Sequence, residues 1–225
     1  MRITFLGHAA VRLEIGDADV LIDPFLSDNP LAPVAAEELS PSHVLLTHGH
    51  PDHVGDTVAL ARRCGATVVA SVEIAAWLGA QGVEDAIGIN LGGTLSLSFG
   101  TVGLHPAWHS NSLPDGSYGG MPAGVLLRAE GRTIYHVGDT ALFSDLSLVG
   151  RHGIDLAFVP IGDHFTMGPD DAIEAVRLLR PRQVIPVHYD TFPPIRQDAS
   201  AFVVRVERET EASGLALAPG EGLDL

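Results

Sequence analysis

The chain has 225 residues, of which 46% are hydrophobic, with 25 glycines and 15 prolines. This composition predicts one compact α/β domain over residues 1–225, with a duplicated α/β unit as an equally compatible organisation. The formal charge is −15, and all 13 lysine-plus-arginine positions are arginine. The acidic charge argues against nucleic acid as a partner. The absence of lysine excludes Schiff-base catalysis and a P-loop phosphate site. We therefore expect a small-molecule substrate or ligand.

The cysteine content, the first residues and the length of the apolar runs indicate the cellular compartment. Cys64 is the only cysteine, so an internal disulfide and a thiolate metal cluster are both excluded. Met1 and Arg2 lead directly into an apparent strand, which leaves no room for a signal peptide. No apolar run approaches membrane-spanning length. We expect a cytoplasmic protein without a membrane partner, and a homo-oligomer stays an open alternative.

The first half of the chain predicts short strands, followed by alternating helices and strands. Apolar runs bounded by turn residues are typical of strands, and Gly16-Asp17-Ala18-Asp19 is typical of a hairpin turn. A Pro-containing loop from Asp23 to Pro41 leads to a buried strand that ends at a histidine-rich segment. In chain order we expect strands at 2–6, 10–15, 18–23, 43–46 and 66–70, with helices near 55–64 and 72–80.

The second half repeats this arrangement. Further strands are expected within 86–105, with Gly92-Gly93 as a turn, before a long polar loop from Pro106 to Pro122. A helix at 170–180 has Pro169 at its start and Pro181 after its end. The remaining expectations are strands near 124–129, 133–137, 155–160, 183–187 and 215–218, and a helix near 198–211. Two sheets packed face to face, with helices outside, would bury such apolar strands on both faces.

The segment Thr47-His48-Gly49-His50-Pro51-Asp52-His53 concentrates metal-binding side chains. Side chains two apart on an extended backbone point to the same side, so His48 and His50 can share one ion. Asp52 and His53 follow where the chain is expected to turn into a helix, and they are aimed at a neighbouring position. Imidazole and carboxylate are ligands that zinc, iron or manganese accept. The segment therefore predicts a metal site.

Further ligands are expected at strand ends elsewhere, because four residues in one loop rarely complete a hydrolytic site. His109 lies just past the strand that ends at His105. Asp139 follows the strand 133–137, where Gly138 lets the backbone turn. His188 lies at the carboxyl end of another strand, where α/β proteins place their chemistry.

The order and spacing of these seven residues resemble the metallo-β-lactamase superfamily. The flanking segments resemble a branch of small metal-dependent hydrolases related to ascorbate-6-phosphate lactonases, and the resemblance runs from about Ile3 to Pro219. It is carried by Gly7-His8-Ala9, Leu21-Ile22-Asp23-Pro24, Tyr135-His136-Val137-Gly138-Asp139-Thr140, Phe165-Thr166-Met167-Gly168-Pro169 and the segment from Pro186 to Pro194. The resemblance implies a four-layer αββα sandwich, with two mixed β-sheets and helices on the outer faces.

The resemblance also implies two divalent metal ions at one edge, zinc first, with manganese, nickel or iron as alternatives. It assigns His48, His50 and His109 to the first ion, Asp52, His53 and His188 to the second, and Asp139 to a bridging position. Two ions about 3.5–4 Å apart can share a water and lower its pKa toward neutrality. We therefore expect a bridging hydroxide to attack a small ester, lactone or phosphoester, with Asp52 and Asp139 as catalytic residues.

Other functions stay open beside hydrolysis. An iron-dependent redox enzyme of the persulfide dioxygenase kind shares the His-x-His-x-Asp-His run, whereas oxygen reductases generally have Glu where this chain has His50. A phosphodiesterase or nuclease of the same superfamily is disfavoured by the acidic charge. A β-lactam substrate is disfavoured by the lack of a secretion signal. A non-catalytic, metal-stabilised scaffold is disfavoured because the ligand set is complete.

Several residues outside the ligand set are candidates for supporting roles. His164 follows a strand end and is the third catalytic candidate, as an acid or substrate contact, with a backbone-bonded loop histidine as the alternative. His8 is expected either beside a ligand or in the core, and His136 in the core. Asp23 is expected to orient a ligand histidine. Ser110, Asn111 and Tyr189 are candidate substrate contacts only because they flank ligands. Arg196 is the nearest arginine after His188 and could meet an anionic substrate, but a surface role is favoured.

Overall fold

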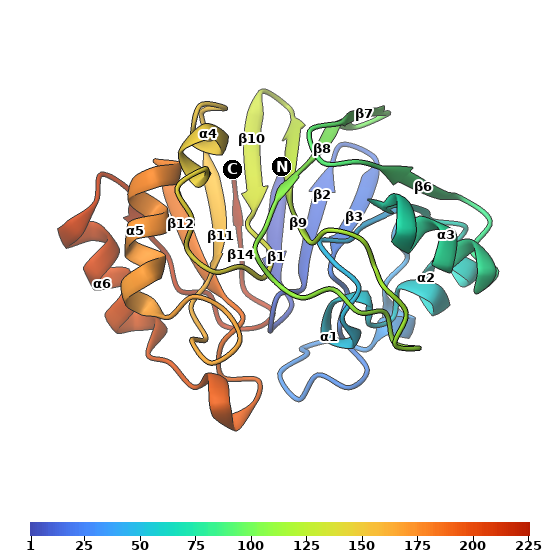
Figure 1. The fold of residues 1–225 in the computed structure, drawn as a ribbon, viewed down its shortest axis with the longest axis horizontal. Coiled ribbons are helices and arrows are strands. Elements are labelled where there is room, and N and C mark those ends of the chain that lie inside the picture. The colour runs from blue at the N-terminus through green and yellow to red at the C-terminus, as the bar shows by residue number, and fades with distance from the viewer.

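Short apolar strands separated by turns build two seven-stranded sheets (Figure 1). The structure is a computed structural model that describes residues 1–225. In spatial order, the first sheet contains β14 (Gly222–Asp224), β1 (Arg2–Phe5), β2 (Val11–Ile15), β3 (Ala18–Ile22), β4 (His43–Leu45), β5 (Thr67–Ser71) and β6 (Ala86–Ile89). Strand β3 pairs antiparallel with β2 and parallel with β4, so the sheet is mixed.

The second sheet has the same mixed character. Strand β10 pairs antiparallel with β9 and parallel with β11. In spatial order this sheet contains β13 (Ser213–Gly214), β12 (Gln183–Val187), β11 (Leu156–Pro160), β10 (Arg132–His136), β9 (Ala123–Ala129), β8 (Gly100–Pro106) and β7 (Thr94–Leu97). The expected turn at Gly92-Gly93 therefore carries the chain from the last strand of one sheet to the first strand of the other.

Helices cover the outer face of each sheet (Figure 1). They are α1 (Pro51–Val54), α2 (Thr57–Cys64) and α3 (Val72–Ala80) beside the first sheet, and α4 (Leu146–Gly150), α5 (Pro169–Leu179) and α6 (Ala199–Glu209) beside the second. One apolar core, which includes Leu13 and Phe158, joins the inner faces of the sheets. Two further cores join each outer face to its helices. The expected four-layer αββα sandwich is confirmed.

Most predicted elements are present, and α3 and β12 have the predicted bounds. The helix near 55–64 begins earlier, at Pro51, and is interrupted at Gly55, where φ is +44°. A Cβ at Gly55 would lie 2.4 Å from the Pro24 carbonyl oxygen, so the backbone passes too close to the preceding loop for any other residue. Helix α4 was not predicted.

The predicted strand at 215–218 is wrong. The chain there crosses from β13 in the second sheet to β14 in the first, without pairing as a strand. Leu217 is buried between the sheets and Leu215 packs against the same core. Both leucines face the core between the sheets, and alanines alternate with them. This alternation resembles the pattern of a strand, which explains the wrong prediction.

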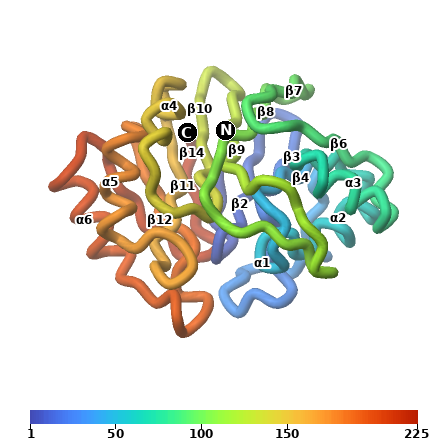
Figure 2. Tube along the Cα trace, in the orientation of Figure 1, coloured from blue at the N-terminus to red at the C-terminus, as the bar shows by residue number.

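The carboxyl ends of several strands meet at one edge of the molecule. Within each sheet, β1, β3 and β4, and likewise β8, β10 and β12, run in the same direction. Figure 2 shows the segments that follow these strands gathered at the lower edge, around α1. Every predicted metal-binding residue lies in one of these segments, so the topology brings residues from both halves of the chain to one place.

Candidate metal centre

Three imidazoles form the first group at this edge. His48 and His50 come from the segment after β4, and His109 comes from the loop after β8. Their possible ligand atoms all lie within 4.8 Å of one another, and His48 Nε2 is 3.0 Å from His50 Nδ1. The extended backbone between His48 and His50 places the two rings on one side, as the sequence pattern predicts.

A second group contains Asp52, His53 and His188, and it also contains His8. These four residues again offer ligand atoms within 4.8 Å of one another. His8 Nε2 lies 3.2 Å from Asp52 Oδ2, and His188 Nε2 lies 4.0 Å from the same oxygen. Asp52 and His53 lie in the single turn of α1, one turn of backbone beyond the first group.

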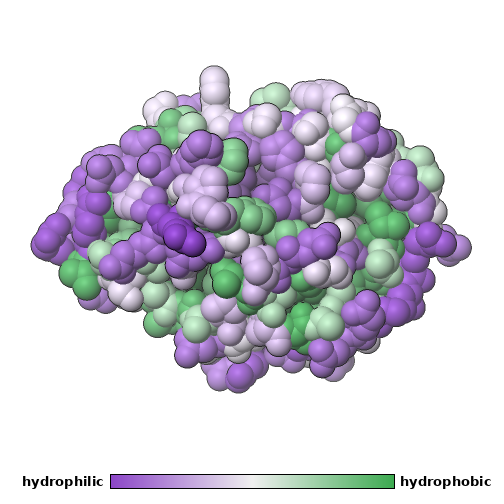
Figure 3. Space-filling model, turned by 90° about the horizontal axis from the view of Figure 1, so that it is seen from below, coloured by the Kyte–Doolittle hydropathy of each residue, from purple (hydrophilic) through white to green (hydrophobic).

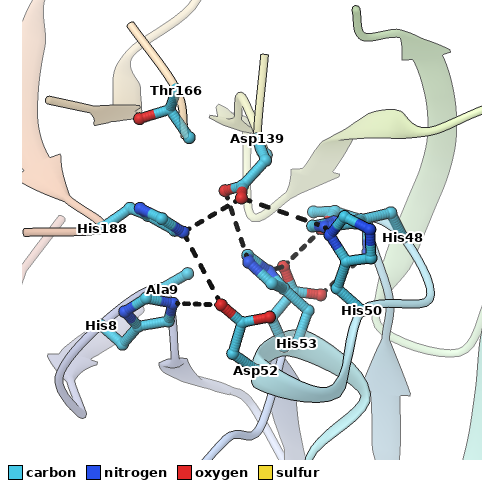
Figure 4. A network of polar contacts seen from close by, with 12 residues as sticks. His8, Ala9, His48, His50, Asp52, His53, Asp139, Thr166 and His188 are labelled. Atoms are coloured by element: carbon cyan, nitrogen blue, oxygen red, sulfur yellow. Dashed lines mark hydrogen bonds and ion pairs between the residues drawn. The ribbon is translucent and has the colours of Figure 1, made fainter. Parts of the chain in front are cut away.

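The Asp139 carboxylate lies between the two groups (Figure 4). Oδ2 is 3.5 Å from His109 Nε2 and 3.0 Å from His188 Nε2. Oδ1 is 3.4 Å from His53 Nε2. The carboxylate is 3% exposed, so it faces imidazoles of both groups and almost no solvent. All seven candidate ligands therefore lie together.

A buried carboxylate determines which nitrogen of two ligand histidines is free. Asp23 Oδ2 accepts a hydrogen bond from Thr47 Oγ1 at 2.6 Å and lies 2.8 Å from His53 Nδ1. His53 therefore donates through Nδ1, which directs Nε2 toward Asp139 as the atom that would bind a cation. The Thr47 hydroxyl, having donated to Asp23, accepts from His48 Nδ1 at 3.0 Å, which leaves His48 Nε2 free as well. The expectation that Asp23 contacts a ligand histidine is confirmed.

Unpaired buried atoms show that the site fits a cation. His53 Nε2, Asp139 Oδ1 and both ring nitrogens of His188 are buried without a hydrogen-bond partner. Buried polar atoms are normally paired, since leaving one unpaired costs about 1–3 kcal/mol. A divalent cation would take the lone pairs of His53 Nε2, Asp139 Oδ1 and His188 Nε2, and a set of imidazoles and carboxylates suits zinc, iron or manganese.

The electrostatics of the site favour the ligand forms of most of these groups. Burial lowers the pKa of His48 well below its usual value and lowers the pKa of His109. Burial opposes ionisation of Asp139, but His188 and His53 outweigh it and hold the Asp139 pKa well below its usual value. Burial also acts against protonated His53, yet Asp139 and Asp23 raise the His53 pKa. A cation at this position would take the place of that proton.

Unusual backbone conformations bring the ligands close. Gly138 has φ +70°, and a Cβ there would lie 2.7 Å from the Ala123 carbonyl oxygen, so only glycine lets Asp139 follow β10 this tightly. His8 and His188 both have φ +56°, a conformation that non-glycine residues seldom adopt. The His188 N–H donates to the His8 carbonyl at 2.7 Å, and this bond holds the two strained residues together.

The other candidate residues lie in several environments. His136 is buried, and its Nε2 lies 2.9 Å from the Ala9 carbonyl oxygen, which confirms the expectation of a core histidine. Asn111 accepts from the Gly49 N–H at 2.7 Å and donates to two carbonyls, so its amide orders the histidine loop. Ser110 Oγ is 3.3 Å from His50 Nε2. His164 is exposed beside Phe165, with ring centroids 4.5 Å apart.

Tyr189 and Arg196 line a surface groove of about 760 Å³, which also contains Asp190, Asp198 and Glu221. The groove lies beside the start of α6. Arg196 therefore shares this groove with three acidic residues, and its side chain makes no polar contact with the candidate ligands.

Sequence reasoning missed two threonines of the site. Thr47 links Asp23 to His48, as described above. Thr140 is buried directly after Asp139, and its Oγ1 accepts from the Trp108 N–H at 2.9 Å while its carbonyl accepts from the Met167 N–H at 3.1 Å. The sequence does show that Thr47 and Thr140 are next to candidate ligands. Asp23, Trp108 and Met167, to which they are hydrogen-bonded, lie more than twenty residues away in sequence.

Comparison with known proteins identifies the family. The family described as Beta-lactamase superfamily domain matches residues 18–189. A UPF0173 metal-dependent hydrolase from Thermus thermophilus is 52% identical over 225 residues, covering 100% of this chain and 99% of that protein. The chain belongs to this superfamily. Within it, the chain belongs to the UPF0173 metal-dependent hydrolases, so the resemblance seen in the sequence is confirmed.

Solved structures support the same assignment. Igni18, a novel metallo hydrolase from the hyperthermophilic archaeon Ignicoccus hospitalis, has a TM-score of 0.90 and 35% identity, covering 99% of this UPF0173 chain and 97% of that chain. CmlA, a diiron beta-hydroxylase from Streptomyces venezuelae, has a TM-score of 0.76 and 20% identity, covering 100% of this chain and 54% of that one. The second likeness concerns the fold alone. None of the helices combines the length and apolar character needed to cross a membrane.

Proposed function

We propose that this UPF0173 protein hydrolyses a small ester, lactone or phosphoester with two divalent cations, zinc in first place. The observation that carries the proposal is the buried Asp139 carboxylate, which faces imidazoles of two separate ligand groups. His48, His50 and His109 would hold one ion, and Asp52, His53 and His188 the other, with Asp139 shared. Because both halves of the chain supply ligands, residues 1–225 act as one domain.

Bound there, two divalent ions would supply hydroxide from a shared water and polarise the scissile bond. The chain itself orients and shields the site. Asp23 and Thr47 orient the rings of His53 and His48 so that Nε2 of each faces the site, and Asp139 is almost completely shielded from water. His164, exposed on the loop after β11, is the candidate acid that would give a proton to the leaving oxygen. In the overall step a water hydroxyl joins the carbonyl carbon or phosphorus, the bond to the leaving oxygen breaks, and that oxygen gains a proton.

The test combines metal analysis with a substrate panel. Protein purified without added metal, and the same protein reconstituted with zinc, would be assayed against carboxyl esters, lactones, phosphodiesters and thioesters. We expect two ions per chain and activity that is lost on chelation. His48→Ala and Asp139→Ala should each lose bound metal and activity, whereas His152→Gln, remote from the site on the segment after α4, should retain both.

Two results would reject the proposal. Full metal content and full rate in Asp139→Ala would show that this carboxylate is not a shared ligand. Stoichiometric iron with a coloured, oxygen-reactive site would favour the redox alternative over hydrolysis. CmlA, a diiron beta-hydroxylase, has a similar fold.

A further inference from the structure

We propose that the substrate is an uncharged ester or lactone with an apolar alkyl or aryl group, and that Trp108 and Phe165 hold this group. The inference rests on the hydrolysis proposed above and narrows its substrate class. It removes the phosphoester from the range of substrates, and it assigns a binding role to two aromatic residues outside the ligand set.

The first observation is the exposure of two aromatic side chains beside the ligands. Trp108 is 68% exposed and Phe165 is 53% exposed. Trp108 directly precedes the candidate ligand His109. Phe165 directly precedes Thr166, which Figure 4 shows next to Asp139 and His188. Burial of large aromatic side chains away from water is favourable, so their exposure beside a reactive centre is typical of a binding surface.

The second observation is a shared attachment of the two aromatic loops. The Trp108 N–H donates to Thr140 Oγ1 at 2.9 Å, and the Thr140 carbonyl accepts from the Met167 N–H at 3.1 Å. Thr140 is buried and directly follows Asp139. One residue beside the shared carboxylate therefore fastens both loops, which places Trp108 and Phe165 on segments that flank the site.

Further contacts support each aromatic residue on its loop. The Trp108 carbonyl accepts from the Ala141 N–H at 3.0 Å, and its ring lies 6.4 Å from the Phe143 ring. The same long loop exposes Tyr118 and Met121. Figure 3 shows the face at this edge, where apolar patches interrupt the hydrophilic surface. The loop of Trp108 thus carries two further exposed large side chains.

The third observation is the lack of basic residues near the centre. The chain contains no lysine. Among the segments after the strand ends, 6–10, 23–42, 46–56, 107–122, 137–145, 161–168 and 188–198, Arg196 is the only arginine. Its groove also contains Asp190, Asp198 and Glu221. Proteins normally add arginine or lysine to the metal ions when they bind phosphate or carboxylate groups, so an anionic substrate would have only the two cations as partners here.

The first test measures how the rate depends on the length of the substrate's acyl group. The zinc-loaded, full-length protein would be assayed with p-nitrophenyl acetate, butyrate, hexanoate and octanoate, and with bis(p-nitrophenyl) phosphate. We expect kcat/KM to rise at least tenfold from acetate to octanoate. Trp108→Ala and Phe165→Ala should each lower kcat/KM for octanoate about tenfold, mainly through KM, and change the value for acetate less than twofold. Val204→Ala, which removes an exposed apolar side chain on α6, is the matched control and should change neither.

The second test measures binding without turnover. Trp77 and Trp108 are the only tryptophans, so Trp77→Phe leaves Trp108 as the single reporter. Addition of 2-decanone, an uncharged ketone that cannot be hydrolysed, should shift the Trp108 emission to shorter wavelength with saturation. Phe165→Ala in the same background should weaken this binding several-fold.

The two proposals fail in different ways. Equal kcat/KM across the acyl series, a preference for the phosphodiester, or equal losses for acetate and octanoate in the variants would overturn the substrate inference and leave hydrolysis standing. If no ester, lactone or phosphodiester is cleaved, the proposed function is rejected. Saturable ketone binding at Trp108 would then support an apolar ligand site independently of hydrolysis, and absence of such binding would overturn it.

Discussion

Asp23 and His53 form a fully buried hydrogen bond of 2.8 Å, and the same carboxylate oxygen accepts from Thr47 at 2.6 Å. Thr47 in turn contacts His48. One carboxylate therefore orients a candidate ligand of each ion. A change at Asp23 should affect both metal positions, although Asp23 is not a ligand in either group proposed above.

Asp23→Asn should weaken binding of both ions by about 10–100-fold. The Thr47 N–H donates to Asp23 Oδ1, whereas the Thr47 hydroxyl and His53 donate to Oδ2. The amide nitrogen cannot accept a hydrogen bond, so one of these two sides loses its acceptor. The free energy of unfolding should also fall by about 1–3 kcal/mol. Metal titration against a competing chelator and urea unfolding would measure both effects. Asp19→Asn, in the surface ion pair with Arg12, is the control; equal metal loss in both variants would contradict the assignment.

His8→Asn should lower the affinity of the second ion selectively, by about 10–100-fold. His8 is buried, with ring nitrogens 3.2 Å from Asp52 Oδ2 and 2.9 Å from Thr191 Oγ1, and asparagine tolerates the left-handed backbone at this position. Thr191→Val should have a smaller effect in the same direction. Stepwise loading with cobalt, followed by its visible absorption, would separate the two ions. Equal loss of both ions would show that His8 has only a general structural role.

His164→Gln should lower kcat by about 10²–10⁴-fold if His164 protonates the leaving group. Metal content should not change, because His164 belongs to neither of the two groups of candidate ligands. The loss should be larger for alkyl esters than for p-nitrophenyl esters, since p-nitrophenolate leaves without a proton. A uniform loss across leaving groups would contradict a role as an acid and favour a substrate contact.

Stability should decrease as the pH falls from about 6.5 to 4, and His105 should contribute to this. Burial, with His152 and Arg128, lowers the His105 pKa to about 4, whereas in the unfolded chain it should be near 6.5. Between these values the unfolded chain binds a proton that the folded chain does not, so acid favours unfolding. Because His105 is partly exposed, its contribution should be about 1 kcal/mol. Urea unfolding at pH 7 and pH 4.5 should show that the free energy of unfolding falls less with acid in His105→Gln than in the unchanged protein. An equal fall in both proteins would refute this contribution of His105.

The local pattern of residues was sufficient for most elements of the fold. Alternating and continuous apolar runs bounded by Gly and Pro predicted β12 and α3 at their observed bounds. They failed at 215–218, where Leu215 and Leu217 face a core between two sheets. They failed also at Gly55, where the Pro24 carbonyl passes within 2.4 Å of a would-be Cβ. Neither contact has a signal within the local sequence.

By itself, the sequence determined the kinds of ligand and where along the chain they occur, because His, Asp and their spacing are local properties. The convergence of these residues depends on tertiary structure, since parallel strands of two sheets must end at one edge before His48, His109 and His188 can meet. Tertiary structure also decided what no spacing encodes: that Asp23 reaches His53 and Thr47, that His8 joins Asp52, and that Thr140 fastens the loops of Trp108 and Phe165. Hydrogen bonds between residues far apart in sequence exist only after the chain has folded.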